Sequence, residues 1–250
     1  MEKKINLKGI IFDKDGTLFD YSSVWHDVIV KSVDKAFRTS NSKRNNKRKK
    51  DFIKLLGLDE NGTTNAKGVI FSHGKYNITK KGLWFCLSNL ILPSTLIKIS
   101  IKIQEYNNIF IEEKIKSMDF SKQAKIFKEL KELGYKIAVV TVDNRTSANL
   151  FIKHMGIEQY VDYVSTKDDE FKNKPKPDSF IHFCDMFNLQ PEEVAMVGDT
   201  LTDMRYARNS NAGYIVGLLW GSNDYPNLKK YSNAIYPDLF HLKKDKTIFK

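Results

Sequence analysis

Residues 9–20 read GIIFDKDGTLFD, an apolar run that ends in two carboxylates two positions apart. A continuous apolar run of this kind is typical of a buried strand in a parallel sheet. Residues two apart on an extended segment point to the same side, so Asp13 and Asp15 should face one space at the strand end. Gly16 then permits a sharp turn, because glycine adopts backbone angles that other residues avoid. Buried carboxylates are costly unless they are paired or serve a cation, so this stretch indicates a site.

The second half of the chain alternates between strand-like and helix-like segments. Strands are predicted at 136–141, 160–164, 194–197 and 214–217, and helices at 120–133, 146–155, 177–187 and 202–209. This alternation predicts an α/β fold, a doubly wound parallel sheet of the Rossmann-like type with helices on both faces. In such sheets, ligands bind beyond the carboxyl ends of the strands, where the strand order turns back.

The segment 21–117 interrupts this alternation. It contains four helix-like stretches and no clear strand pattern; the stretches are 24–37, 50–56, 80–92 and 95–116. We therefore predict a helical domain at 21–117, inserted after the first strand of a core that consists of residues 1–20 and 118–250.

The positive charge of the chain has a local source. The net charge is +11, and residues 43–50 alone carry six lysines and arginines. This run has no interleaved aromatic residues and no recognisable nucleic-acid-binding fold around it. We interpret residues 43–50 as a solvated loop and do not expect a nucleic acid partner.

No targeting or membrane-spanning signal stands out in the sequence. Residues 1–8 are polar, and the longest other apolar stretch, 83–92, is too short to span a bilayer. The two cysteines lie far apart and lack metal-ligand spacing, which is typical of reduced thiols. We expect a cytoplasmic monomer or homodimer without a membrane partner.

Polar residues also follow the other predicted strands. Thr141 ends the strand at 136–141, and Asp199 and Asp203 follow the strand at 194–197. Lys174 precedes the predicted helix at 177–187. The carboxyl ends of parallel strands meet at one edge of a sheet, so these side chains should join the first two carboxylates in one site.

In these motifs the sequence resembles the haloacid dehalogenase superfamily of hydrolases, in the branch that includes phosphoglycolate phosphatase. The family's Asp-x-Asp-Gly-Thr-Leu motif matches residues 13–18, and its Thr or Ser after an apolar strand matches Thr141. Its Lys-Pro-x-Pro motif matches 174–177, and its Gly-Asp-x-x-x-Asp motif matches 198–203. The resemblance implies a magnesium-dependent phosphatase for a small phosphorylated metabolite, with residues 21–117 as a helical cap domain.

The resemblance also implies a role for each catalytic residue. Asp13 is expected to attack phosphorus and form an aspartyl-phosphate, while Asp15 acts first as the acid and then as the base. The Thr141 hydroxyl is expected to bind phosphate oxygens, and Lys174 to keep Asp13 ionised and offset phosphate charge.

A metal ion and supporting residues follow from the same resemblance. Mg²⁺ is expected to bind Asp13, Asp199 and the backbone carbonyl of Asp15, since it prefers oxygen ligands. A cation is also needed on electrostatic grounds, because two like charges about 4 Å apart repel by about 4 kcal/mol at an effective dielectric near 20. Asp203 is expected to hold Lys174 or a metal-bound water, and Gly16 and Thr17 to complete the first motif.

Several alternatives stay open at this point. Asn144 and Arg145 could bind substrate phosphate, and a helix N-terminal role fits equally well because Asn favours that position. A phosphomutase of the beta-phosphoglucomutase type and a non-catalytic binding protein on the same fold are the competing functions. The identity of the substrate and the cap residues that select it cannot be read from the sequence.

Overall fold

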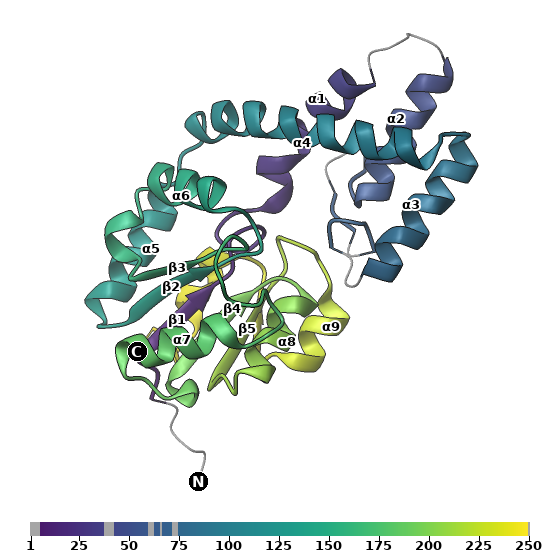
Figure 1. Cartoon of the computed structure of the whole chain (residues 1–250). Coiled ribbons are helices and arrows are strands. Elements are labelled where there is room, and N and C mark those ends of the chain that lie inside the picture. The colour runs from purple at the N-terminus through teal and green to yellow at the C-terminus, as the bar shows by residue number, and fades with distance from the viewer. Residues whose placement is uncertain (1–5, 38–42, 60–62, 66, 72–74, 250) are drawn as a thin grey trace. The chain divides into compact units, whose positions relative to one another are not determined.

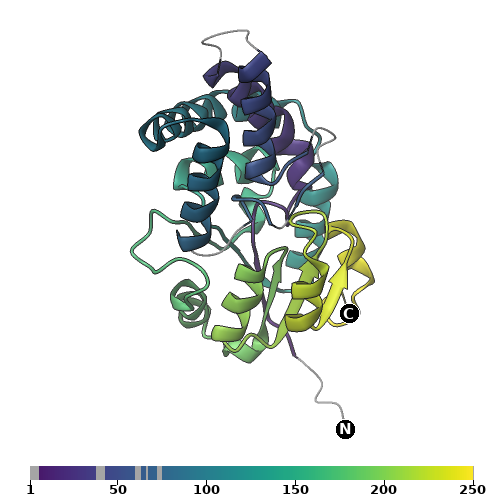
Figure 2. The same cartoon turned by 90° about the vertical axis from the view of Figure 1, so that its right-hand side faces the viewer.

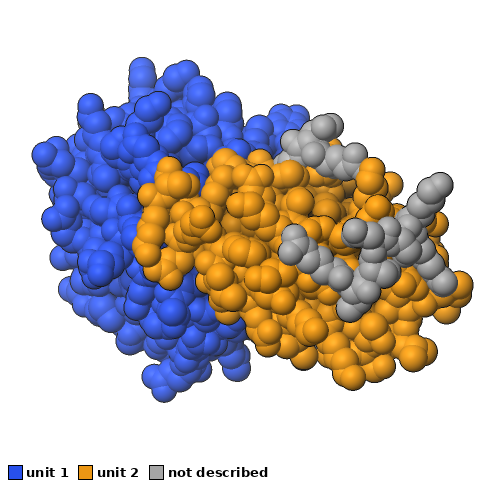
Figure 3. Space-filling view, turned by 90° about the horizontal axis from the view of Figure 1, so that it is seen from above, with its two compact units in different colours: residues 1–20, 118–250 blue, residues 21–117 orange. Residues whose placement is uncertain are grey.

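Two groups of elements make up the protein. The computed structural model describes residues 6–37, 43–59, 63–65, 67–71 and 75–249. Unit 1 consists of Met1–Asp20 and Met118–Lys250, and unit 2 is Tyr21–Ser117 (Figure 3).

A six-stranded parallel sheet forms the centre of unit 1 (Figures 1 and 2). Its strands are β1 (Gly9–Phe12), β2 (Lys136–Val140), β3 (Tyr163–Ser165), β4 (Val194–Gly198), β5 (Tyr214–Leu218) and β6 (Ala234–Tyr236). The strand order is β3-β2-β1-β4-β5-β6, so the chain builds outward from β1 in one direction and then from β4 in the other. The predicted doubly wound α/β fold is confirmed.

Helices cover both faces of this sheet (Figure 1). They are α5 (Ser121–Glu132), α6 (Arg145–His154), α7 (Asp178–Phe187), α8 (Leu201–Asn209) and α9 (Tyr225–Tyr231), with 3-10 turns η1 (Glu158–Tyr160), η2 (Pro191–Glu193) and η3 (Leu239–Lys244). Ile11 shares a buried cluster with Phe183 of α7 and Met204 of α8. The ring of Phe12 lies 5.0 Å from that of Phe127 in α5. Neighbouring residues of β1 thus contact helices on opposite faces, as the alternation of side chains along a strand requires.

Unit 2 is helical in its described residues, apart from an isolated bridge between Leu58 and Thr64. Its helices are α1 (Tyr21–Ala36), α2 (Lys43–Leu56), α3 (Lys75–Asn89) and α4 (Pro93–Lys116). A core of buried side chains joins them, including Val33, Phe52, Phe85 and Ile103. The helical character predicted for this segment is therefore correct.

No single helix among the described residues combines the length and apolar composition of a membrane span. The segment Ile78–Asn89 of α3 and helix α4 meet both criteria only as a pair, and that pair is bent by 110° at its break.

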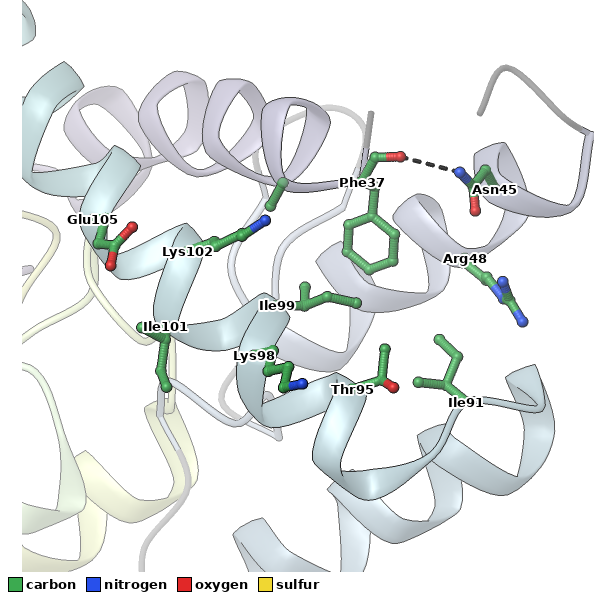
Figure 4. Close-up of a pocket in the computed structure, with 11 residues that line it drawn as sticks. Phe37, Asn45, Arg48, Ile91, Thr95, Lys98, Ile99, Ile101, Lys102 and Glu105 are labelled. Atoms are coloured by element: carbon green, nitrogen blue, oxygen red, sulfur yellow. Dashed lines mark hydrogen bonds between the residues drawn. The ribbon is translucent and has the colours of Figure 1, made fainter. Parts of the chain in front are cut away.

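The prediction of a solvated loop at residues 43–50 is wrong, because these residues form the first turns of α2. The Asn45 amide donates a hydrogen bond of 3.0 Å to the carbonyl of Phe37, just beyond the end of α1 (Figure 4). The Arg48 guanidinium donates to the carbonyl of Asn89, the last residue of α3, at 2.9 Å and 3.1 Å. Polar side chains of α2 thus satisfy carbonyls that two other helices leave unpaired at their ends.

These contacts explain why the sequence pattern misled. A run of like charges favours a solvated segment when it is considered alone. Lysine and arginine are nevertheless good helix formers, and contacts that are distant in the sequence decide the outcome here.

Beside α2, a pocket of about 480 Å³ lies between the end of α1 and the first half of α4, with Phe37, Ile99 and Lys98 in its wall (Figure 4).

The C-terminal part of unit 1 contains elements that the sequence did not predict. Strand β6, helix α9 and turn η3 follow the last strand expected from the pattern. Strand β6 is only three residues long and half-buried along its length, so it shows neither a continuous apolar run nor a clear alternation.

The Arg48→Met substitution should lower the melting temperature, because it removes the hydrogen bonds of a charged donor to the end of α3. The expected cost is about 1.5–3 kcal/mol, the usual range for hydrogen bonds that involve a charged group. Thermal unfolding followed by circular dichroism measures it, and Lys47→Met at an exposed position of the same helix is the matched control. Equal melting temperatures of the two variants would contradict the structural role of α2.

Candidate active site

Two acidic residues follow the central strands where the strand order turns back. Phe12 is paired in register with Val139 of β2 and Val197 of β4. Asp13 comes next, and its amide donates a hydrogen bond of 2.9 Å to the carbonyl of Val197. Asp199 is the first residue after β4 and lies one position beyond Gly198, which is level with Asp13. The sheet therefore brings both carboxylates to one edge, at the place where ligands bind in doubly wound folds.

Three buried carboxylates gather at this edge. Oxygen atoms of Asp13, Asp199 and Asp203 lie within 4.8 Å of one another. All three residues are buried, so their mutual repulsion is screened less than it would be at the surface. A buried cluster of this kind needs positive charge nearby.

Lys174 supplies part of that charge. Its ammonium group lies 2.5 Å from Asp13 Oδ1 and 2.6 Å from Asp203 Oδ1, and the side chain is buried. Burial alone would lower the pKa of Lys174, but the carboxylates of Asp13 and Asp203 raise it above its ordinary value. Lys174 therefore stays positively charged between the two acids.

Burial and the excess negative charge raise the pKa values of two acids in the cluster. Burial raises the pKa of Asp13 to about 7, although Lys174 acts in the opposite direction. Burial, followed by the repulsion of Asp13 and Asp203, raises the pKa of Asp199 well above its usual range. A single lysine does not balance three carboxylates, and the site favours a further cation.

Asp199 is fixed by residues from two other loops. Its Oδ2 accepts a hydrogen bond of 2.7 Å from the amide of Ser222, and its Oδ1 accepts one of 3.4 Å from the Thr17 hydroxyl. Gly16 has a φ of +80°, and a Cβ there would lie 2.7 Å from Asp199 Oδ2. A Cβ on Gly221 would lie only 2.0 Å from the same oxygen. Two glycines thus allow the loops after β1 and β5 to close around this carboxylate.

Asp203 contacts both the N-terminus of α8 and Lys174. Its Oδ2 accepts hydrogen bonds from the amide of Thr200 at 3.0 Å and from the hydroxyl of Thr200 at 2.6 Å. This is a capping box at the N-terminus of α8. Its Oδ1 accepts from Lys174, so both oxygens are engaged within the protein. The geometry supports the predicted role of Asp203 in holding Lys174.

Thr141 lies at the same edge, directly after β2. It is buried, and its amide donates a hydrogen bond of 2.9 Å to the carbonyl of Ser165. Its hydroxyl oxygen accepts a hydrogen bond of 3.1 Å from the amide of Asp143. Thr141 thus occupies the strand-end position that was predicted for it.

Asp15 belongs to a second charged group that the sequence reasoning missed. Its Oδ2 lies 2.7 Å from the ammonium group of Lys14, which also lies 3.0 Å from Asp143 Oδ2. Burial alone would lower the pKa of Lys14, but Asp15 and Asp143 raise it. The signal was present in the sequence, since Lys14 interrupts an acidic pair directly after a buried strand.

Asn144 and Arg145 are engaged in local structure. Asn144 is the N-cap of α6, and its side chain accepts a hydrogen bond of 2.8 Å from the amide of Ser147. The Arg145 guanidinium donates to the carbonyl of Val164 at 3.0 Å and forms an ion pair with Asp169. These contacts account for both side chains, and the substrate-binding prediction gains no support from them.

The donor set fits a hard divalent cation. All three ligand candidates are carboxylates, and magnesium prefers oxygen. Asp13 and Asp199 are the strongest candidates, because the pKa of each is raised by burial and by neighbouring acids, a penalty that a bound cation would relieve. Asp203 is already used by the protein, because one of its oxygens pairs with Lys174 and the other completes the capping box of α8. The backbone carbonyl of Asp15 stays a prediction.

The Asp199→Asn substitution should stabilise the metal-free protein at pH 8. The pKa of Asp199 is raised in the folded state, so its ionisation costs folding free energy as the pH rises above the ordinary value of 3.8. In EDTA at pH 8 we expect the melting temperature to rise by about 5 °C, with the difference shrinking toward pH 4.

Differential scanning fluorimetry with and without Mg²⁺ measures both effects. Mg²⁺ should stabilise the natural chain and leave Asp199→Asn nearly unchanged. Asp185→Asn, at an exposed position of α7, is the control and should match the natural chain both in EDTA and with Mg²⁺. If Asp199→Asn were less stable than the natural chain at pH 8 in EDTA, ionised Asp199 would not destabilise the metal-free protein, and its assignment as a cation ligand would lose this support.

Known proteins are similar to this chain in sequence. The family model for haloacid dehalogenase-like hydrolases matches residues 7–211. Pyrophosphatase PpaX of Bacillus mycoides is 32% identical over 103 residues, which cover 41% of this chain and 47% of that protein. A phosphoglycolate phosphatase of Nitrosococcus oceani is 32% identical over 94 residues, which cover 38% of this chain and 41% of that protein. The chain thus spans less than half the length of each of these two curated relatives.

Solved structures share the fold over nearly the whole chain. The crystal structure of a predicted phosphoglycolate phosphatase from Haemophilus somnus has a TM-score of 0.66 at 19% identity, and the match covers 96% of this chain and 97% of that one. This likeness concerns the fold, whereas the family model spans both acidic strand ends of the site. The chain belongs to the haloacid dehalogenase-like hydrolase family.

Proposed function

We propose that this protein is a magnesium-dependent phosphatase that hydrolyses a small phosphorylated metabolite through an aspartyl-phosphate. One observation carries the proposal. A buried nucleophile candidate, Asp13, lies 2.5 Å from a buried lysine and beside two further carboxylates at the edge of the sheet. This arrangement suits a site that must bring an anionic nucleophile to a phosphate dianion.

In the first step, an oxygen of Asp13 attacks phosphorus and the bond from phosphorus to the leaving oxygen breaks. Lys174 favours the ionised form of Asp13 and offsets phosphate charge. Mg²⁺ held by Asp13 and Asp199 would neutralise further charge on the phosphate oxygens. The Thr141 hydroxyl would donate a hydrogen bond to one of those oxygens.

Asp15 would handle the proton in both steps. Its carboxyl group gives a proton to the leaving oxygen as the bond to phosphorus breaks. The resulting carboxylate then takes a proton from water, whose oxygen attacks the phosphorus of the aspartyl-phosphate. Inorganic phosphate leaves and Asp13 returns as a carboxylate. Splitting one difficult substitution into two easier ones is the gain from covalent catalysis.

The relatives support this reaction class. One relative is named a pyrophosphatase and the other a phosphoglycolate phosphatase. Both names denote hydrolysis of a bond between phosphorus and oxygen. We further propose that unit 2 is the cap that selects the substrate.

The Asp13→Asn substitution should abolish hydrolysis of p-nitrophenyl phosphate, because an amide neither attacks phosphorus nor binds a cation as a carboxylate does. We expect a loss of at least about 1,000-fold in kcat, comparable to the removal of a catalytic group in other enzymes that use covalent catalysis. Activity of the natural chain should need Mg²⁺ and disappear in EDTA, while Asp185→Asn should keep it.

Two measurements separate phosphatase from its alternatives. Rapid acid quench followed by mass spectrometry should show one added phosphoryl group on the natural chain and none on Asp13→Asn. Release of inorganic phosphate at the rate of substrate loss indicates water as the acceptor. Transfer to a second sugar hydroxyl would instead indicate a phosphomutase, and no reaction with any phosphate ester would indicate a non-catalytic protein.

A further inference from the structure

Lys14 is a buried cation at the edge of the candidate site, and the reaction steps above do not use it. Its side chain is 0% exposed, and its ammonium group lies 2.7 Å from Asp15 and 3.0 Å from Asp143. We propose that Lys14 is a positioning residue that fixes the carboxyl group of Asp15 for proton exchange with the leaving oxygen. This inference rests on the proposed phosphatase function.

The surroundings of Lys14 hold its ammonium group in one place. The group lies 4.0 Å from the centre of the Phe151 ring and 5.8 Å from that of Phe19. The two rings stack on each other at 4.8 Å, and both are fully buried. A cation over an aromatic face gains electrostatic attraction, and a buried aromatic pair leaves it little room to move. Lys14 is therefore a rigid point of attachment.

Asp15 is less enclosed than the lysine that holds it. The Asp15 side chain is 24% exposed, whereas Lys14 lies wholly in the interior. Lys14 pairs with Oδ2 of Asp15, and we assign proton exchange to Oδ1. Loss of this ion pair would weaken the positioning of the carboxyl group. Displacements of about 1 Å in a catalytic group can cost about 100-fold in rate.

The second partner of Lys14 connects it to the loop after β2. The Asp143 amide donates to the hydroxyl oxygen of Thr141, and the Asp143 carboxylate binds Lys14. The Asp15 carboxyl group and the Thr141 loop therefore have a common anchor. A buried ion pair seldom adds stability over a well-packed apolar side chain, so orientation explains this lysine better than stability does.

The test is the dependence of kcat/KM on the leaving group. We use a series of aryl phosphates whose leaving groups have pKa values from about 7 to about 10. Leaving groups with a low pKa depart readily without a proton, whereas those with a high pKa need protonation. In Lys14→Met we expect kcat/KM to fall by about 100-fold for phenyl phosphate and by less than about 10-fold for p-nitrophenyl phosphate. The plot of log kcat/KM against leaving-group pKa should therefore be steeper than for the natural chain.

Two further variants keep this result interpretable. Lys14→Met combined with Asp143→Asn removes the buried ammonium group together with the Asp143 carboxylate that pairs with it. It guards against misfolding caused by an unpaired Asp143, and it should show the same steep plot. Asp143→Asn alone leaves the pair of Lys14 and Asp15 intact and should keep the slope of the natural chain, whatever its absolute rate. Circular dichroism verifies that each variant is folded.

The outcomes separate this inference from the function on which it rests. If the natural chain is active and both Lys14 variants give plots parallel to its own, Lys14 has only a structural role and the inference fails. A steep plot for Asp143→Asn alone would also overturn it, because the pair with Asp15 would then not be the cause. If the natural chain hydrolyses no member of the series, the proposed function itself fails and this inference falls with it.

Discussion

The site depends on burying several negative charges at one edge of the sheet. Lys174 lies between Asp13 and Asp203, and this contact joins the segments that follow β1, β3 and β4. The central sheet can bring Asp13 and Asp199 together only if part of their repulsion is cancelled. The pKa values of Asp13 and Asp199 are raised because they are buried and because the lysine cancels only part of the negative charge.

The sequence predicted the parts of this site that depend on local pattern. The apolar run at 9–12 and the acids after it placed the central strand, and the spacing of GDTLTD placed Asp199 and Asp203 on a second strand end. Lys14 was missed although it lies between the two acids of the first motif, because its second partner, Asp143, comes from the loop after β2 and only the fold brings the two together. The first turns of α2 were missed for a related reason, since the end of α3, 41 residues further along the chain, receives the side chain of Arg48.

The two units contribute different things to the proposed enzyme. Unit 1 contains the acidic strand ends and Lys174, the side chains on which the proposed chemistry rests. Unit 2 has its own aromatic and aliphatic core, so it can hold a shape independently of the sheet. Fold alone does not identify a substrate, and the choice among phosphate esters rests with side chains outside the motifs.

Asp203 connects the first turn of α8 with the charged groups of the site. One of its oxygens completes the first turn of α8 and the other holds the ammonium group of Lys174. Fraying of that single turn would release the lysine from one of its two acids and shift the charge balance around Asp13. The capping of α8 and the position of the Lys174 ammonium group therefore depend on one side chain, so the helix cannot change at its first residues without changing the surroundings of Asp13.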